Sequence, residues 1–549
     1  MSNDRTPRWL TPSRRRFLAG VGATGIAGLA GCAGGEGGGE GGSDGSGDGG
    51  SGGGTGNDGS GETAGSSDGG SGSEEETTVR IGIANGGWDL IPARDTDFDS
   101  NKVYTLIYDN VVNLNAAAEV VPDLAREWSR ESDTQYVFSL EEGVTFHDGT
   151  EFTADDVKYT YDWIVENENP RKNYVSAVED VVVEDDFTVR FDLSEPFAPF
   201  LYKVHAVMWP LSQTAMEEYG DEYNQNPVGT GPFELTEWES GNRAVLEAYD
   251  DYWKDDQPNI DRIEFRILPE DSSKVAQLET GSIDLVDRMP PQFTDRVESS
   301  GSARVITTTG VSSGRVDFNT DVEPLGDRRV RRALAWAIDK ERIVETVLQG
   351  YGKPGKAILP DSFPQYNDSI SDFDHPTGNP SRAQELLDEA GYGDGLSLEI
   401  KTSTQSRHRR AATLIQSMWG EVGVDVSIQS LEGNAFWSQE TSGDFEVAVS
   451  NFTWFGDPDT LLYLYHSEGL NVWNISNSEL DGLLEDQRRT VAPESRAEVI
   501  NRIQEITYEE AYSIYTYYPQ RIQGISTRIS GFEQYPNGSF RSLDGASVE

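Results

Sequence analysis

One segment near residue 450 gathers side chains that are well suited to holding a small ligand. It reads Asn-Phe-Thr-Trp-Phe-Gly-Asp-Pro-Asp and spans residues 451–459. A predicted strand ends here in aromatic side chains, Trp454 and Phe455, followed by the carboxylates of Asp457 and Asp459. A partly desolvated carboxylate makes a charge-assisted hydrogen bond to a cation, and strand backbone can pair with an extended peptide. The segment is therefore the first candidate for a ligand-binding site.

The same two carboxylates have a structural alternative. Asp457 and Asp459 precede a predicted helix over residues 460–465, and aspartate is a common cap of the first helical turn. Ligand contact and helix capping both fit the sequence. We favour ligand contact for Asp457 and capping for Asp459.

Three further side chains are candidates for ligand contact. Trp437 lies before the strand that leads to residue 451, and Trp88 follows the first predicted strand of the body. Each indole either lines a pocket or fills the core, and core packing is the commoner role of tryptophan. Arg407 begins a predicted helix, where its guanidinium either pairs with a ligand carboxylate through two parallel hydrogen bonds or lies in solvent.

The sequence carries no recognisable catalytic motif. Its five histidines form no HExxH pair, and no Walker A sequence is present. GxGxxG occurs at residues 20–25 and GxSxG at 49–53, but neither stands between a strand and a helix as its chemistry requires. The single cysteine, Cys32, excludes a disulfide, a zinc cage and an iron–sulfur site. We therefore expect no enzymatic activity, no metal site and no cofactor.

The charge balance excludes further classes of function. The 549 residues include 95 acidic and 44 basic side chains, which gives a formal charge of −51. Such a surface repels nucleic-acid phosphates and anionic lipid headgroups. Only 10 of the 44 cations are lysines, and this acidic, lysine-poor composition resembles that of salt-loving archaea. At molar salt the Debye length falls to about 3 Å, which screens the self-repulsion of the surface.

The first 32 residues predict an export signal and a lipid anchor. Arg14 and Arg15 precede an apolar run over residues 17–31, which is shorter than the ~20 residues of a membrane-spanning helix. This pattern is typical of a twin-arginine signal. The run ends in Leu-Ala-Gly-Cys, which resembles a lipobox, so we expect Cys32 to be lipidated.

Residues 33–76 predict a flexible tether. Glycine occupies 21 of the 41 positions from 33 to 73, and serine, aspartate and glutamate make up most of the others. No core forms from that composition, and a coil of this length spans about 35 Å root-mean-square. The expected product is an extracytoplasmic body at the cell surface, anchored by lipid to the cytoplasmic membrane.

The remainder of the chain predicts a mixed α/β body. Alternating apolar and polar residues predict strands, and the 3.6-residue period predicts helices. The expected strands are 79–83, 136–140, 178–183, 187–193, 233–239, 243–248, 263–268, 315–319, 396–401, 424–430, 445–451, 512–518 and 520–526. The expected helices are 102–110, 153–166, 272–280, 327–337, 339–349, 380–390, 407–421, 477–489 and 493–510. The alternation after residue 380 indicates βα units on a mixed sheet.

Several blocks together resemble one protein family. The blocks are Pro-Asp-Leu-Ala-Arg-Glu-Trp at 122–128, Gly-Val-Thr-Phe-His-Asp-Gly at 143–149, Phe-Thr-Ala-Asp-Asp-Val at 152–157, Asn-Pro-Val-Gly-Thr-Gly-Pro-Phe at 226–233, the helix at 327–339 and the helix at 383–392. In this order and spacing the chain resembles family 5 of the extracellular solute-binding proteins, the peptide-, dipeptide- and nickel-type receptors of ABC importers. The resemblance covers most of residues 78–530.

The resemblance implies a two-lobed periplasmic-binding-protein-like clamshell of type II, with mixed sheets and an additional subdomain. Lobe I would comprise residues 78–118, 227–318 and 519–549. The additional subdomain would be residues 119–226, and lobe II residues 319–518. It also implies a monomer that closes on a small ligand and serves an ABC permease, with no nucleic-acid partner.

The resemblance also implies a ligand. In peptide-binding members a W-x-x-D pattern sets the aspartate against the α-ammonium of the ligand, and Trp454 and Asp457 match it. The family often has two residues between this aspartate and a following Asp-Pro, whereas Pro458 directly follows Asp457 here. Two alternatives therefore stay open: Asp459 is the partner of the ammonium group, or the ligand has no amine. A peptide is the favoured ligand, with an oligosaccharide or a nickel chelate as alternatives. A surface sensor or a secreted hydrolase is less favoured.

Overall fold

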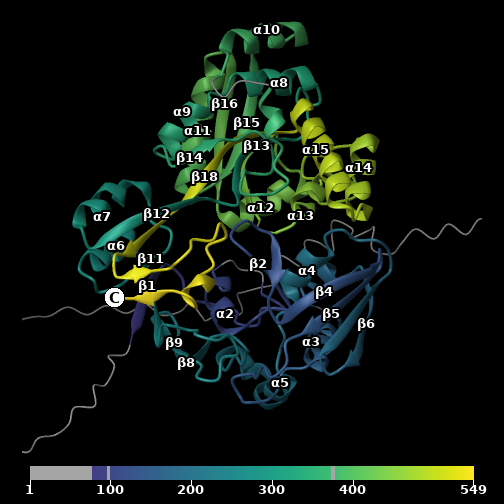
Figure 1. The fold of residues 1–549 in the computed structure, drawn as a ribbon. Helices are drawn as coiled ribbons and strands as arrows, with labels where there is room; N and C mark the ends of the chain where they lie inside the picture. The colour runs from purple at the N-terminus through teal and green to yellow at the C-terminus, as the bar shows by residue number, and fades with distance from the viewer. Residues whose placement is uncertain (1–76, 96–98, 168, 373–377, 455) are drawn as a thin grey trace, which may run out of the picture.

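The computed structural model describes residues 77–549 except 96–98, 168, 373–377 and 455. The predicted export arginines Arg14 and Arg15, the lipidation site Cys32, the tether and Phe455 lie outside the described residues. The body has two lobes, one above the other in Figure 1, with the chain's C-terminus on the lower one.

A mixed sheet forms the centre of the lower lobe. Its strands are β8 (Phe233–Glu239), β9 (Arg243–Ala248), β10 (Arg262–Ile267), β1 (Thr78–Ile83), β11 (Leu285–Val286), the second half of β18 (Ser513–Ser526) and β12 (Ala303–Thr309). Strand β1 lies parallel to β10 and β11, and β18 runs antiparallel to β11 and β12. The helices of this region are α2 (Asn101–Ile107), α6 (Asp271–Glu279) and α7 (Thr294–Ser300), and β19 (Ile529–Ser530) pairs with β20 (Ser547–Val548) near the C-terminus.

A second, four-stranded antiparallel sheet lies beside the first, at the lower right of Figure 1. Its strands, in spatial order, are β4 (Ala125–Ser132), β5 (Gln135–Leu140), β7 (Thr188–Leu193) and β6 (Val178–Asp185). Three helices accompany it: α3 (Ala154–Glu166), α4 (Phe200–Val207) and α5 (Gln213–Tyr219). Phe200 of α4 packs on this sheet against Phe138 and Phe191, with ring centroids 6.3 and 5.5 Å away.

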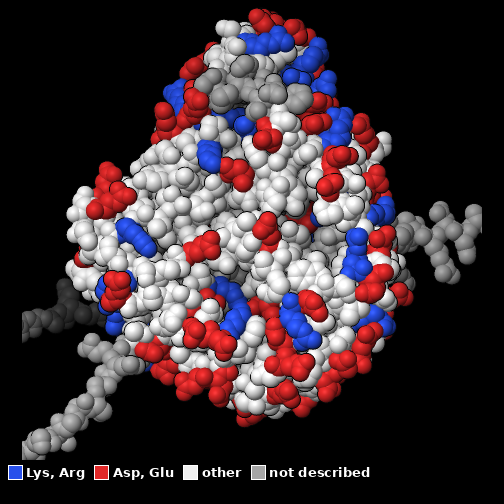
Figure 2. Space-filling model, in the orientation of Figure 1, with Lys and Arg blue, Asp and Glu red and all other residues white. Residues whose placement is uncertain are grey.

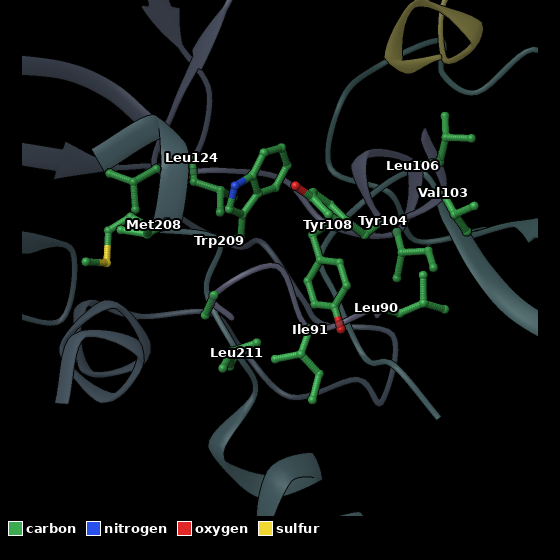
Figure 3. Packing of buried hydrophobic residues seen from close by; sticks show 14 of the residues in the cluster. Leu90, Ile91, Val103, Tyr104, Leu106, Tyr108, Leu124, Met208, Trp209 and Leu211 are labelled. Atoms are coloured by element: carbon green, nitrogen blue, oxygen red, sulfur yellow. The ribbon is translucent and has the colours of Figure 1, made fainter. Parts of the chain in front are cut away.

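The core of this sheet is continuous with that of the lower lobe. Buried side chains of both belong to one cluster, part of which is shown in Figure 3 around Trp209 and Tyr104, whose rings meet edge to face at 5.4 Å. Strands β2 (Val112–Leu114) and β3 (Val120–Pro122) pair across residues 118 and 119, where the subdomain was expected to begin. The insertion therefore shares its packing with the lobe that carries it.

The sheet of the lower lobe continues into the upper lobe, and its second part forms the centre of that lobe. Among the described residues the whole sheet has 12 strands. The strands of the upper lobe are β16 (Val424–Leu431), β15 (Leu396–Ser403), β17 (Val447–Thr453), β13 (Ser312–Phe318), β14 (Gly352–Pro354) and the first half of β18. Its helices are α8 (Arg328–Trp336), α9 (Lys340–Val347), α10 (Pro380–Ala390), α11 (Ser406–Gly420), α12 (Gly433–Ser442), α13 (Asp459–Leu462), α14 (Ser478–Arg489) and α15 (Pro493–Glu509). Strand β15 pairs in parallel with both β16 and β17, which confirms the predicted βα units.

Strand β18 belongs to both lobes. Residues 513–517 pair with β13 above, and residues 520–526 pair with β12 below. The sequence analysis predicted two strands here, but the hydrogen-bonded ladders continue past Pro519. The chain also crosses between the lobes from β12 to β13, so Ser312–Phe318 lies in the upper lobe rather than in the lower one as expected.

Most predicted elements form within two or three residues of their expected bounds. The helix over 154–166 begins as predicted, because Thr153 and Asp156 make a capping box, and Asp327 and Asp339 cap α8 and α9. The sequence patterns did not predict the strands β2, β3, β4, β11, β12, β14, β19 and β20 or the helices α4, α5, α7 and α12. Among the described residues, no helix combines the length and apolar character needed to cross a bilayer.

His147 holds two loops of the lower lobe together. Its Nε2–H donates to the Gly231 carbonyl at 2.9 Å, and its Nδ1 accepts from the Gly229 N–H at 3.4 Å. The acceptor role of Nδ1 requires a neutral ring, and burial lowers the pKa of His147 to about 4. These contacts give His147 a structural role.

This arrangement makes the stability of the lower lobe depend on pH. The folded pKa of His147 is below the unfolded value of 6.5, so the unfolded chain binds more protons between pH 6.5 and 4. Its stabilisation is present above pH 6.5 and is lost as the pH falls towards 4, on the order of 3 kcal/mol. In thermal unfolding, His147→Gln should show a smaller loss of melting temperature between pH 7 and 4.5 than the wild type. Equal losses would contradict this role.

Candidate ligand-binding site

The carboxyl ends of three parallel strands of the upper lobe face the lower lobe. β15, β16 and β17 run in the same direction and end at residues 403, 431 and 453. In Figure 1, α12 and α13, which follow β16 and β17, lie at the bottom of the upper lobe, just above β2. Ligands of open α/β sheets bind outside the carboxyl ends of the strands, which makes this edge the candidate site.

A polar cluster lies at this edge. The Asn451 Nδ2 donates to the Ser312 and Thr453 hydroxyls, both at 3.1 Å. The Asn451 Oδ1 accepts from His408 Nε2 at 2.6 Å, and His408 Nδ1 accepts from the Ser403 hydroxyl at 2.7 Å. Burial lowers the pKa of His408 to about 4, so the ring is neutral and fixes the orientation of the Asn451 amide. The exposed residue Thr453 completes the cluster, because its hydroxyl donates to the Ser312 hydroxyl at 3.2 Å.

Aromatic side chains flank the polar cluster. The half-buried Trp454 ring lies 6.1 Å from the ring of Tyr174, which belongs to the four-stranded-sheet region of the lower lobe. The half-buried Trp437 on α12 meets Phe452 of β17 edge to face at 6.3 Å. Because successive side chains of a strand alternate, Phe452 and Trp437 lie on the face of the sheet opposite Asn451 and Thr453. The end of β17 is therefore polar on one face and aromatic on the other, which suits a ligand with both polar and apolar parts.

A buried ionic cluster fixes α12, and with it Trp437, against the sheet. Glu440 of α12 accepts from Arg315 of β13 at 2.9 Å and from the Ser450 hydroxyl at 3.0 Å. Burial outweighs the Arg315 charge and raises the pKa of Glu440 to about 7. The Arg315 guanidinium also lies 3.3 Å from the centre of the Phe452 ring. Ionic contacts as well as packing therefore hold α12 and Trp437 against the sheet.

The carboxylate of Asp457 is occupied within the chain. Both oxygens accept from Arg496 of α15, each at 2.6 Å, and the side chain is 1 % exposed. One oxygen also accepts the backbone N–H of Asp459 at 2.8 Å. A ligand ammonium would have to displace a bidentate arginine to reach this carboxylate, so the geometry opposes the ammonium-binding role expected for Asp457.

The carboxylate of Asp459 is likewise hydrogen-bonded and ion-paired within the chain. Arg488 donates to both of its oxygens, at 2.6 and 3.0 Å, Gln487 donates at 2.6 Å, and the Lys203 ammonium lies 3.7 Å away. Although burial alone would raise the pKa of Asp459, the charges of Arg488 and Lys203 hold it far below its usual range. Asp459 therefore joins α13 and α14 to α4 of the lower lobe and is not free for a ligand ammonium.

The two other predicted contact residues, Trp88 and Arg407, differ in their surroundings. Trp88 is 4 % exposed and packs in the core of the lower lobe, 5.8 Å from the Trp238 ring and 6.0 Å from the Phe265 ring. Of the two roles considered for it, core packing is the one observed, and Trp88 is not a ligand contact. Arg407 is exposed in the first turn of α11, beside His408. Its side chain forms no hydrogen bond or ion pair with another described residue, which leaves it available at the edge of the site.

The lobes touch on the side of the site away from β18. Lys203 Nζ of α4 donates to the Thr460 hydroxyl at 2.8 Å, and the Ala198 N–H donates to the Arg488 carbonyl at 2.6 Å. Arg489 pairs with Glu195 at 3.3 Å. The ligand-facing edge is thus enclosed between the shared strand on one side and these polar contacts on the other.

Sequence reasoning missed the polar cluster. Ser312, Ser403 and His408 were not proposed as site residues, and Asn451 and Thr453 were considered only as part of their segment. The available clue was that Ser403 and Thr453 end parallel strands. Among the described residues, no group of three or more histidine, cysteine or acidic side chains is placed to hold a metal ion.

Comparison with known proteins assigns this chain to one protein family. The model of "Bacterial extracellular solute-binding proteins, family 5 Middle" matches residues 119–471, well over half of the chain. The chain belongs to this family. It is an extracytoplasmic solute receptor of an ABC importer, not an enzyme.

Individual relatives agree with this placement. The chain is 27 % identical over 495 residues to the dipeptide-binding protein of Escherichia coli, covering 83 % of this chain and 91 % of that one. It is 28 % identical over 487 residues to heme-binding protein A of Haemophilus influenzae, covering 81 % and 87 %. The crystal structure of the substrate-binding protein CtaP of Listeria monocytogenes superposes with a TM-score of 0.80 at 24 % identity, covering 86 % and 100 %. The fold is accordingly the two-lobed type II fold of periplasmic binding proteins.

The Asp457–Arg496 pair gives a test that separates a structural from a ligand-binding role. Asp457→Asn leaves the buried Arg496 charge uncompensated, which costs about 3–5 kcal/mol and should lower the melting temperature by on the order of 5 °C. Combining it with Arg496→Met should restore part of the loss. An Asp457→Asn protein that melts like the wild type but no longer binds its ligand would return the ammonium role to Asp457.

Proposed function

We propose that this receptor binds a short peptide between its two lobes and delivers it to an ABC permease. The observation that carries the proposal is the polar and aromatic edge formed by Asn451, Thr453 and Ser312 beside Trp454 and Trp437. Such an edge offers hydrogen-bonding groups for peptide amides and apolar surface for peptide side chains. The dipeptide-binding relative supports the same ligand class.

The charges at the site refine the mode of binding. Asp457 and Asp459 are both ion-paired within the chain, so the proposal assigns the peptide ammonium to neither of them. Arg407 is the available cation at this edge, and we assign it to the carboxylate of the peptide. Binding then depends on amide hydrogen bonds and aromatic contacts, which tolerate varied peptide sequences.

Calorimetry with defined di- to pentapeptides tests the ligand class. In molar salt the wild type should bind at least one peptide of the set, and mass spectrometry should find peptides released from the denatured protein. Thr453→Val should weaken binding about 5–30-fold through one lost hydrogen bond, and Trp454→Ala by more. Thr280→Val, at an exposed threonine of the lower lobe, is the matched control and should bind normally. If the protein binds no peptide but releases a sugar or heme on denaturation, its role as a solute receptor stands and the proposal of a peptide ligand is wrong.

We further propose that the receptor is a monomer tethered to the membrane by lipid on Cys32 after twin-arginine export, in salt-rich surroundings that suit its charge of −51. In the native host, wild-type protein should partition into the detergent phase of Triton X-114, because an acylated N-terminus adds apolar area. The variant Cys32→Ser should instead be found in the aqueous phase. Replacing both Arg14 and Arg15 with lysine should retain the protein in the cytoplasm. Aqueous partitioning of the wild type would refute the anchor.

A further inference from the structure

The upper lobe contains a cavity that lies away from the predicted peptide site. It has a volume of about 300 Å³ and lies where α8, the end of α15 and the start of β18 meet (Figure 1). The strand register fixes its place along the sheet. Ser513, in the cavity wall, is opposite Asp317, and Asp317 is opposite Ala448 near the start of β17. Thr453 ends the same strand at the opposite edge, so the two sites lie towards opposite edges of one sheet.

Four cations line this cavity. Arg328 pairs with Glu510 at 2.7 Å, and Lys340 donates to the Gly355 carbonyl at 2.9 Å. The side chains of Arg332 and Lys356 are half-buried, yet neither has a hydrogen bond or ion pair with another described residue. Partly buried charges are normally paired. Unlike the exposed Arg407, both of these side chains are half-buried in the wall of one cavity, where an anionic ligand would compensate their charge.

The remaining charge and shape of the wall define what the cavity fits. Glu510 neutralises Arg328, and Glu509 contributes one charge that opposes Arg332 and Lys356, so these three side chains leave a net positive wall. Trp336 and Tyr508 add flat aromatic surface. A cavity of about 300 Å³ is at the lower end of the range for small-molecule sites. Aromatic walls favour a flat apolar body, and the cations favour an anionic group at its end.

We propose that this cavity is a second ligand site, which takes a small organic anion with a flat body and a single carboxylate or phosphate group. Arg332 and Lys356 bind the anionic group, and the aromatic side chains hold the flat part. The site is independent of the peptide site, because none of its residues lies at the carboxyl-end edge of β15 and β17.

Calorimetry with two probes tests the site: indole-3-acetate for the carboxylate and adenosine 5′-monophosphate for the phosphate. At 1 M sodium chloride at least one probe should bind with a Kd below about 1 mM. The Arg332→Gln, Lys356→Gln double variant should bind it at least tenfold more weakly, which corresponds to about 1.4 kcal/mol.

A matched control separates the site from the overall charge. Lys158→Gln with Arg296→Gln removes the same two charges from exposed ion pairs outside the cavity and should leave the Kd unchanged. Trp454→Ala, which impairs the predicted peptide site, should also leave it unchanged. The proposal is overturned if neither probe binds, if the cavity variant binds like the wild type, or if Trp454→Ala abolishes binding. Melting temperatures of all variants exclude unfolding as the cause.

Discussion

The strand β18 is hydrogen-bonded into both lobes, and the relative position of the lobes depends on it. Its first half extends the upper sheet beside β13, and its second half extends the lower sheet beside β12. The second crossing, between β12 and β13, runs beside it, where the Gly310 N–H donates to the Pro519 carbonyl at 3.0 Å. A Cβ at Gly310 would come within 2.9 Å of that carbonyl oxygen, so only glycine fits the approach. The lobes are thus joined by two adjacent strands on one side.

The candidate site follows from this connection. Because β15 and β17 run parallel to each other and their carboxyl ends face the lower lobe, Thr453 and Trp454 reach the space between the lobes. On the far side the lobes meet through isolated polar contacts such as Lys203 with Thr460. These contacts include the buried ion pair of Lys203 with Asp459 as well as the partly exposed pair of Arg489 with Glu195. The lobes are therefore held on both sides of the site, by a continuous hydrogen-bonded ladder at β18 and by side-chain contacts on the far side.

The distribution of acids explains why composition and site chemistry must be considered separately. The face shown in Figure 2 carries acidic side chains along most of its outline, as a charge of −51 requires. Inside the molecule, carboxylates such as Asp457 and Glu440 are engaged by arginines instead. Removing one partner of such a pair costs more than the pair contributes, because it leaves a buried charge unpaired. A buried aspartate at the end of a strand is therefore not by itself evidence of a ligand contact.

The sequence alone determined the class of the fold, most elements and the family, because hydrophobic periodicity, caps such as Thr153 and Asp327, and the spacing of the blocks are local properties. It also singled out the segment around Trp454, which follows β17 at the carboxyl-end edge of the parallel strands. Only the tertiary structure decided which side chains there are free. Arg496 is 39 residues from Asp457, and Trp238 is distant in sequence from Trp88, so no local pattern showed that one carboxylate was neutralised or that one indole was buried. The availability of a charge or a ring is set by partners that folding brings from elsewhere in the chain.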